Sequence, residues 1–362
     1  MQPETDQLLD IFRSIKEPDT GKDILSLQMV RDLKIDQKSI NFSIHLPSAK
    51  YPHKDVLYSS LYQILKKEFP DYEPNAHFIA YQPHSEAPNT VVPQIKNFIA
   101  VASGKGGVGK STISANLAIS LAKLGFKAGI LDTDLYGPSM PTIFGIKNKR
   151  PQVVQKDGKN LLVPIDVNGI PVISLGNIIE PEQAVVLRGP RLGAIIKQFF
   201  LDTVWPELDY LIIDLPPGTG DIQLTLVQTI PITGVVLVTT PQEVAVADAI
   251  KAANMFMLDQ ISVPILGVIE NMSYFSPPDM QDKKYYIFGK GGGQRLSDFT
   301  KSVILGKIPI HESIRQRADH ELSIFDQDES SVEFGQIADK LVERIKHRNQ
   351  TNTPTKIVQL TQ

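Results

Sequence analysis

The sequence predicts a doubly wound α/β domain with a mostly parallel sheet, preceded by a small α+β domain. From Ile95 onward, short apolar segments alternate with longer segments of helical periodicity, and several of the short segments are apolar on both faces. Before residue 82 the chain instead combines amphipathic helices with isolated alternating segments. We therefore expect a small α+β domain at 1–82, a linker at 83–96, the larger domain at 97–348 and a disordered tail at 349–362.

The first domain is expected to contain two helices and at least two strands. Helical spacing of apolar residues predicts helices at Gln7–Ile15 and Asp55–Phe69. Alternation predicts a strand at Ser39–Leu46, and Ala76–Tyr81 is expected to close the sheet. The segment Tyr81–Gln94 has three prolines and no periodicity, which is typical of a linker.

The larger domain shows the strand–helix alternation of βαβ units. Seven segments are expected to be strands: Asn97–Ala102, Ala128–Asp132, Val172–Leu175, Tyr210–Asp214, Gly234–Thr239, Ile265–Glu270 and Val303–Ile308. The expected helices include Ser111–Leu124, Arg188–Phe200 and Val244–Leu258.

The overall composition limits the available functions. The 362 residues carry 37 Lys and Arg against 40 Asp and Glu, so the net charge of −3 offers no global attraction to nucleic acid. The N-terminus lacks the features of a signal peptide and no apolar run is long enough to span a bilayer, so we expect a cytoplasmic protein. The chain has no cysteine, which excludes disulfides, thiolate nucleophiles and cluster ligation by its own thiolates.

A glycine-rich loop after the first strand of the larger domain is the strongest functional signal. Residues 104–111 read GKGGVGKS and match the phosphate-binding pattern G-x-x-x-x-G-K-S between a strand and a helix. We expect Lys110 to contact the β- and γ-phosphates of ATP, Ser111 to ligate Mg²⁺ and Thr112 to reach the α-phosphate. The other loop residues expected to bind nucleotide are Gly104, Lys105, Gly106, Gly107, Val108 and Gly109.

Carboxylates follow two of the predicted strands. Asp132 and Asp134 come at the end of one, where open α/β sheets bind ligands, although Asp132 could instead cap the turn. Asp214 ends another apolar strand, and a carboxylate there is costly unless it faces a cation such as Mg²⁺. Asp221 is either a helix N-cap or a nucleotide-sensing residue. The amide of Asn271 can pair with adenine or form a turn.

The loop resembles the deviant Walker A motif of the MinD-like P-loop ATPases, because it carries a second lysine at Lys105. Further segments are similar to the Mrp/ApbC family of iron–sulfur cluster carrier ATPases: DLYGPSMP (Asp134–Pro141), VLRGPRLG (Val186–Gly193), DLPPGTGD (Asp214–Asp221), VIENMSYF and YYIFGKGGG (within Val268–Gly293), and GKIPIHESIRQRAD (Gly306–Asp319). The segment Lys16–Ile35 looks like the iron–sulfur-assembly domain that is often fused ahead of such ATPases.

The resemblance implies a homodimer that binds ATP and Mg²⁺, hydrolyses ATP slowly and delivers iron–sulfur clusters to recipient proteins. It implies that Lys105 reaches the phosphates held by the partner subunit and that Asp134 activates the attacking water. It also implies that Asp132 supports the Mg²⁺ shell and that Asn271 reads the adenine base. The residues expected to act in catalysis are Lys105, Lys110, Asp134 and Asp214.

One segment departs from that family. The family has Cys-x-x-Cys after the ENMSYF-like stretch, whereas Ser276–Gly289 reads SPPDMQDKKYYIFG, and the cysteine usual in the accessory domain is also missing near Pro47–Asp55. Two alternatives to a cluster carrier therefore stay open. One is a positioning ATPase like MinD or ParA, with membrane contact through the C-terminal helix Phe334–Arg348. The other is an ATP-gated scaffold that carries no cluster. Arg188 and Arg191 could serve dimer or partner contacts.

Overall fold

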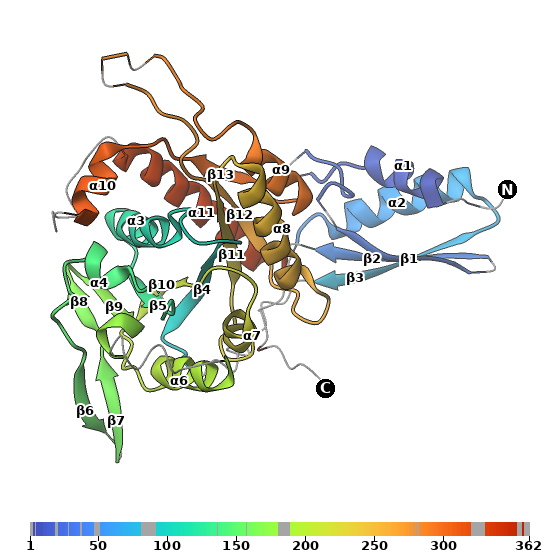
Figure 1. The fold of residues 1–362 in the computed structure, drawn as a ribbon. Helices are drawn as coiled ribbons and strands as arrows, with labels where there is room; N and C mark the ends of the chain where they lie inside the picture. The colour runs from blue at the N-terminus through green and yellow to red at the C-terminus, as the bar shows by residue number, and fades with distance from the viewer. Residues whose placement is uncertain are drawn as a thin grey trace. The chain divides into compact units, whose positions relative to one another are not determined.

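The computed structural model divides into two compact units, Met1–Glu86 and Ala87–Gln362 (Figure 1). It describes all residues except 1, 2, 4, 19, 20, 28, 37, 47–50, 81–91, 136, 157, 180–188, 278, 281, 320–329, 353–356 and 358–362. The predicted linker at 83–96 spans the division between the units, and most of it lies outside the described residues.

The N-terminal unit is a three-stranded sheet with two helices on one face (Figure 1). Its elements are α1 (Thr5–Ser14), β1 (Val30–Asp36), β2 (Ser39–Leu46), α2 (Lys54–Glu68) and β3 (Glu73–Ala80). β1 is antiparallel to the central strand β2, and β3 is parallel to it, with α2 as the crossover. Phe12, Phe42 and Leu61 are buried between the helices and the sheet. The small α+β fold is confirmed.

Strand β1 is an element that the sequence pattern does not predict. Its pairing with β2 shifts register between Arg31 and Lys34, so the strand departs from strict alternation of apolar and polar residues. The segment VRDLKID therefore lacks the period-2 signal by which a half-buried strand is recognised.

The second unit is built on an eight-stranded sheet in the order β13-β12-β11-β4-β10-β5-β9-β8. All neighbouring strands are parallel except β8, which is antiparallel to β9. The strands are β4 (Ile95–Ala102), β5 (Ala128–Asp132), β8 (Ile165–Val167), β9 (Ile170–Ser174), β10 (Leu208–Asp214), β11 (Gly234–Thr239), β12 (Ile265–Glu270) and β13 (Ile304–Lys307). The mostly parallel, doubly wound sheet is the predicted fold.

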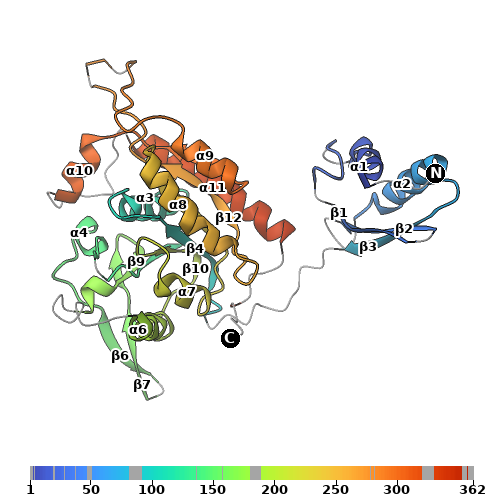
Figure 2. The same cartoon turned by 45° about the vertical axis from the view of Figure 1, so that its right-hand side comes forward.

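Helices cover both faces of this sheet (Figure 2). In β4, Ile99 and Val101 belong to one core, while Phe98 and Ala100 belong to the other, so the strand is apolar on both faces from Phe98 onward. One core includes residues of α3 and α11, and the other includes residues of α6, α7, α8 and α9. The helical elements are α3 (Lys110–Lys123), α4 (Met140–Ile143), η1 (Leu175–Asn177), α6 (Gly189–Leu201), α7 (Asp221–Val227), α8 (Glu243–Met257), α9 (Gly292–Phe299), α10 (Glu312–Asp319) and α11 (Ser331–Thr351).

The C-terminal helix α11 packs on the domain. Its apolar residues Ile337, Leu341 and Ile345 are all buried in the core of the domain, so the apolar face that suggested membrane contact is the face by which the helix packs. The helix continues past Arg348, and the Asn349 amide donates a hydrogen bond to the side-chain oxygen of Asn97 at 2.9 Å. The helix therefore includes the first residues of the segment 349–362 that was expected to be a disordered tail. Among the described helices, none is both long and apolar enough to cross a membrane.

An antiparallel hairpin, β6 (Gln152–Lys156) with β7 (Lys159–Val163), projects from this unit (Figure 1). Every residue of β6 is exposed, so this strand lacks the buried face that makes a strand detectable from hydrophobic alternation. The Asp-Gly pair at 157–158 is a hairpin signal in the sequence.

Candidate functional site

The glycine loop lies at the carboxyl edge of the large sheet. It connects the end of β4 to the start of α3, and β4 is flanked by β10 and β11. β10 also pairs with β5 in a register that places Asp214 beside Asp132. Since parallel strands present their carboxyl ends at one edge, the topology brings the loop and both strand-end carboxylates together.

Two glycines of the loop are required by close packing. A Cβ atom on Gly104 would collide with the backbone of Asp248 in α8. Gly109 has a φ of 83°, and a Cβ there would collide with the side-chain amide of Asn271 at the end of β12. The loop is therefore held between α8 and β12, with its own backbone close to both.

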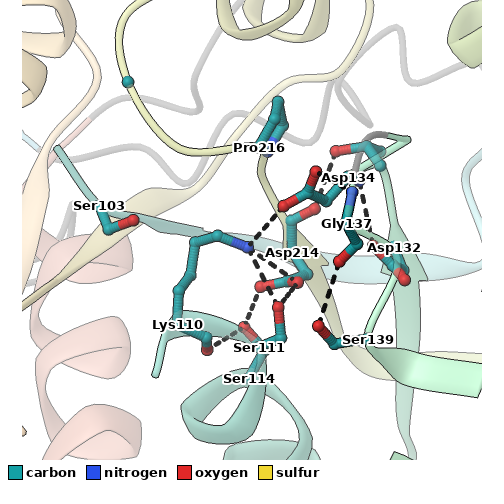
Figure 3. A network of polar contacts seen from close by, with 12 residues as sticks. Ser103, Lys110, Ser111, Ser114, Asp132, Asp134, Gly137, Ser139, Asp214 and Pro216 are labelled. Carbon is teal, nitrogen blue, oxygen red and sulfur yellow. Dashed lines mark hydrogen bonds and ion pairs between the residues drawn. The ribbon is translucent and has the colours of Figure 1, made fainter. Parts of the chain in front are cut away.

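Lys110 and Asp214 form the centre of a buried polar network (Figure 3). The Lys110 Nζ atom lies 2.9 Å from Asp214 Oδ2 and 3.9 Å from Asp134 Oδ2. Both Ser111 and Ser114 donate hydrogen bonds of 2.6 Å to the Asp214 carboxylate. The Asp214 side chain is fully buried, and its carboxylate is in contact with one cation and two hydroxyl groups, as a buried carboxylate requires.

Asp132 lies behind Asp134. Its carboxylate accepts hydrogen bonds from the Asp134 backbone N–H at 3.0 Å and from the Ser174 hydroxyl at 2.8 Å. Complete burial, together with the nearby charge of Asp214, raises the pKa of Asp132 to about 7. Asp134 accepts a hydrogen bond from the Gly137 N–H at 3.2 Å.

A cavity of about 650 Å³ opens beside this network, a size suited to a nucleotide. Two groups of residues line it, one from the glycine loop and one from the segments after β5 and β10. The lining residues are Ser103, Lys105, Gly106, Gly107, Gly109, Lys110, Ser111, Thr112, Asp134, Gly137, Ser139, Pro216, Pro217, Gly220, Ile222 and Gln223. Most of the predicted nucleotide contacts are thus gathered around one cavity.

The donor groups of the cavity fit a nucleotide with its divalent ion. A lysine, a hydroxyl group and glycine-rich backbone at a helix N-terminus are suited to phosphate oxygens. Ser111 Oγ and Asp214 Oδ2, which are 2.6 Å apart, are oxygen ligands of the kind that Mg²⁺ prefers. Four of the predicted site residues are not part of the cavity lining and lie behind the cavity wall: Gly104, Val108, Asp132 and Asp214.

Lys105 and Asn271 each have a partner within the chain. The Lys105 Nζ atom lies 3.5 Å from Gln242 Oε1, at the cavity wall. The Asn271 amide donates a hydrogen bond of 2.8 Å to the carbonyl of Val108, so it supports the glycine loop. The roles of Lys105 across a dimer and of Asn271 in base reading stay predictions.

Three further predicted residues have no described side chain. Arg188 lies outside the described residues. Arg191 falls within α6 and Asp221 is the first residue of α7, but the description does not extend to their side chains.

Ser114, Ser174 and Gln223 contribute to the site but were not predicted from the sequence. Ser114 follows Lys110 by one helical turn, a spacing that could have indicated a shared face. Ser174 and Gln223 reach the site through the packing of β9 and α7, for which the sequence carries no local signal.

The segment between β12 and α9 occupies the position where the resembling family carries its cysteines, and it projects from the domain (Figure 1). Phe275 and Tyr285 pair through two backbone hydrogen bonds of 2.8 Å, and the Lys284 Nζ atom lies 4.4 Å from the centre of the Tyr274 ring. The chain has no cysteine, and the described residues contain no cluster of three His, Asp or Glu that could bind a metal ion. These residues do not fit an iron–sulfur cluster.

The fold, the glycine loop and the lysine–carboxylate network define a P-loop NTPase. A family model described as "NUBPL iron-transfer P-loop NTPase" matches residues 94–346, and one described as "Iron-sulfur cluster assembly protein" matches residues 5–73. The chain belongs to this ParA-type family of P-loop NTPases.

Its relatives narrow the family further. The chain is 39% identical over 322 residues to an iron–sulfur cluster carrier protein of Synechocystis, covering 87% of this chain and 89% of that protein. It is 47% identical over 225 residues to a protein of the same name from Escherichia coli, covering 62% of this chain and 59% of that protein. The chain is therefore a member of the iron–sulfur cluster carrier family, which confirms the predicted resemblance.

Among solved structures, a nucleotide-binding protein from Archaeoglobus fulgidus in complex with ADP is similar to this chain. The two are 39% identical, with a TM-score of 0.55, over 66% of this chain and 91% of the other.

Proposed function

We propose that this protein is a Mg²⁺-dependent ATPase that hydrolyses ATP slowly in the service of iron–sulfur cluster transfer to recipient proteins. The observation that carries the ATPase half is the convergence of Lys110, Ser111 and Asp134 on one cavity beside the glycine loop, with Asp214 behind the cavity wall in contact with Lys110 and Ser111. The observation that carries the transfer half is membership of the iron–sulfur cluster carrier family over 87% of the chain.

In this proposal each group has a distinct task. Lys110 binds the β- and γ-phosphates, and the loop backbone binds the phosphate oxygens. Ser111 would ligate Mg²⁺ directly and Asp214 would hold it through water, and the ion would supply positive charge next to the phosphates. Asp134, on the cavity wall, orients the attacking water and takes up its proton.

The proposal includes a homodimer that forms with bound nucleotide. Lys105 lies at the cavity wall next to the glycine loop, so a second protomer that covers this cavity would bring its own Lys105 to the phosphates. A lysine supplied in this way stabilises charge on the transferred phosphoryl group, as an arginine finger does.

The test is ATP turnover of Lys110→Ala against the parent chain at saturating ATP and Mg²⁺. We expect a loss of at least about 100-fold, because Lys110 stabilises charge that develops on the phosphates. Lys127→Ala is a matched control, since Lys127 forms an exposed ion pair with Glu207 away from the cavity. Asp134→Asn, which preserves size, serves as a second inactive variant if Lys110→Ala does not fold. Equal turnover in parent and variants would reject the ATPase.

The cluster is a cargo in this function, and the chain offers no thiolate to hold it. We therefore assign the cluster ligands to partner proteins and assign the ATP-dependent step to this chain. Anaerobic incubation of the purified protein with iron and sulfide tests this assignment. We expect no retained iron and no visible charge-transfer absorbance, whereas stable iron binding would contradict it.

A second candidate is an ATP-gated scaffold that takes no part in cluster transfer. The absence of cysteine is the observation that favours it. The two candidates differ in one measurement, the rate at which a loaded donor protein activates an iron–sulfur enzyme. Acceleration by this protein with ATP supports transfer, and no effect supports the scaffold.

A further inference from the structure

Gln223 holds the loop that follows Asp214. It lies in α7, and its side-chain nitrogen donates hydrogen bonds to the carbonyls of Pro216 at 2.8 Å and Gly218 at 3.1 Å. Because both neighbours are acceptors, the nitrogen of the amide must face them and the oxygen must face away. The orientation of this amide is therefore determined by its contacts.

The oxygen of the same amide is buried inside the protein. Gln223 is only 2% exposed, and its Oε1 atom accepts no hydrogen bond from any of the described residues. Gln223 also lines the nucleotide cavity, together with Lys110 and Asp134. A buried acceptor without a donor costs free energy, so its partner is expected to come from the contents of the cavity.

The chemistry of the cavity limits what that partner can be. Phosphate oxygens are acceptors and cannot donate to Gln223 Oε1. Lys110 is already engaged by Asp214 and is expected to bind phosphate. The donor that a phosphate-binding cavity regularly contains is water, which both reacts with the γ-phosphate and donates two hydrogen bonds.

We propose that Gln223 accepts a hydrogen bond from the attacking water and so orients it for hydrolysis. This role rests on the proposed ATPase function. The water oxygen forms a bond to the γ-phosphorus, the bond between that phosphorus and the bridging oxygen breaks, and ADP leaves with the electron pair. One water proton is transferred to Asp134. The other proton stays on the water oxygen, where it forms the hydrogen bond to Gln223 Oε1, and Gln223 is unchanged by the reaction.

The test compares Gln223→Met with Gln228→Met. Methionine is close to glutamine in size but lacks the amide, and Gln228 is the exposed C-cap residue of the same helix. Three quantities are measured for each: ATP turnover, affinity for a non-hydrolysable ATP analogue, and affinity for ADP with aluminium fluoride, which imitates the transferred group and its water. Thermal unfolding checks that the variants fold, and Gln223→Asn replaces Gln223→Met if it does not.

For Gln223→Met we expect turnover and aluminium fluoride binding to fall together by about 10- to 100-fold, with affinity for the ATP analogue within about twofold of the parent. Gln228→Met should match the parent in all three. Unchanged turnover in Gln223→Met would overturn the proposed role of Gln223. A loss of affinity for the ATP analogue as large as the loss of turnover would also overturn it, because a purely structural effect weakens ground-state binding too. If the parent itself turns over no faster than Lys110→Ala, the ATPase proposal fails and this role fails with it.

Discussion

Two regions at the carboxyl edge of the same sheet differ in how strongly the fold constrains them. The glycine loop after β4 is enclosed by α8, β12 and the buried Lys110–Asp214 network. The segment after β12, from Ser276 to Gly289, projects from the domain, and Ile287 there is 61% exposed. In the enclosed region each charged or polar group depends on a neighbour, so one change affects several contacts.

The contrast explains how this chain can retain the glycine loop of its family without the cysteines of the projecting segment. In the projecting segment, the ring and backbone contacts that hold it do not involve a thiolate. Replacement of cysteine there removes a ligand without opening a cavity or leaving a buried charge. In the glycine loop, equivalent replacements would disrupt packing or leave the Asp214 carboxylate uncompensated.

Gly104→Ala is expected to have the largest effect on stability. The added methyl group would meet the backbone of Asp248, which cannot move without displacing α8, so we expect a loss of about 3 kcal/mol in the free energy of unfolding. Gly106→Ala, in the same loop, is the control, because nothing lies near its added methyl group. Denaturant unfolding measures both, and equal stabilities would show that packing against α8 does not constrain the loop.

Asp132→Asn is expected to change the pH dependence of stability. The folded pKa of Asp132 is raised to about 7 from 3.8, so its stabilising contribution is complete below pH 4 and is lost as the pH rises through 7. Asparagine stays neutral and avoids this loss. We compare the free energy of unfolding of Asp132→Asn with that of the parent at each pH. We expect this difference to favour the variant by about 2 kcal/mol more at pH 8 than at pH 5.

Thermal and denaturant unfolding of both proteins at the two pH values, without nucleotide, measure this difference. The use of paired proteins cancels the contributions of the other titrating groups. A gain that is the same at pH 5 and pH 8 would mean that Asp132 is already charged in the folded protein at pH 5.

Ile287→Ser in the projecting segment is expected to have the smallest effect. Because most of the Ile287 side chain is already in water, we expect a change of less than about 0.5 kcal/mol in the free energy of unfolding. ATP turnover should stay within twofold of the parent, because Ile287 does not line the cavity. A loss of more than about 1 kcal/mol, measured by denaturant unfolding, would remove the distinction between the two regions.

Several elements were predictable because their signal is local. β5, β11 and β12 have the predicted bounds, since a buried parallel strand is a continuous apolar run between turns. The glycine loop is equally recognisable, because the phosphate-binding pattern specifies residue types at fixed spacing. The β6–β7 hairpin was missed because β6 is exposed along its length, so burial could not produce alternation.

The positions of the carboxylates were only partly predictable. Their place at strand ends follows from the sequence, but the sequence does not show that Asp214 contacts Lys110 while Asp132 lies behind Asp134. That distinction depends on the pairing of β10 with both β4 and β5. The orientation of Gln223 likewise depends on how α7 packs against the loop after β10.

The sequence alone determined the doubly wound fold, the phosphate loop and the absence of thiolate ligands, because apolar periodicity, glycine spacing and residue content are properties of the chain itself. The tertiary structure decided which carboxylate meets Lys110, how Asp132 acquires a raised pKa, and how the Gln223 oxygen is buried without a hydrogen-bond donor among the described residues. These features require residues from distant segments to be brought within a few ångströms of one another, away from bulk solvent. Burial of that kind arises only when the strands pair and the helices pack on them.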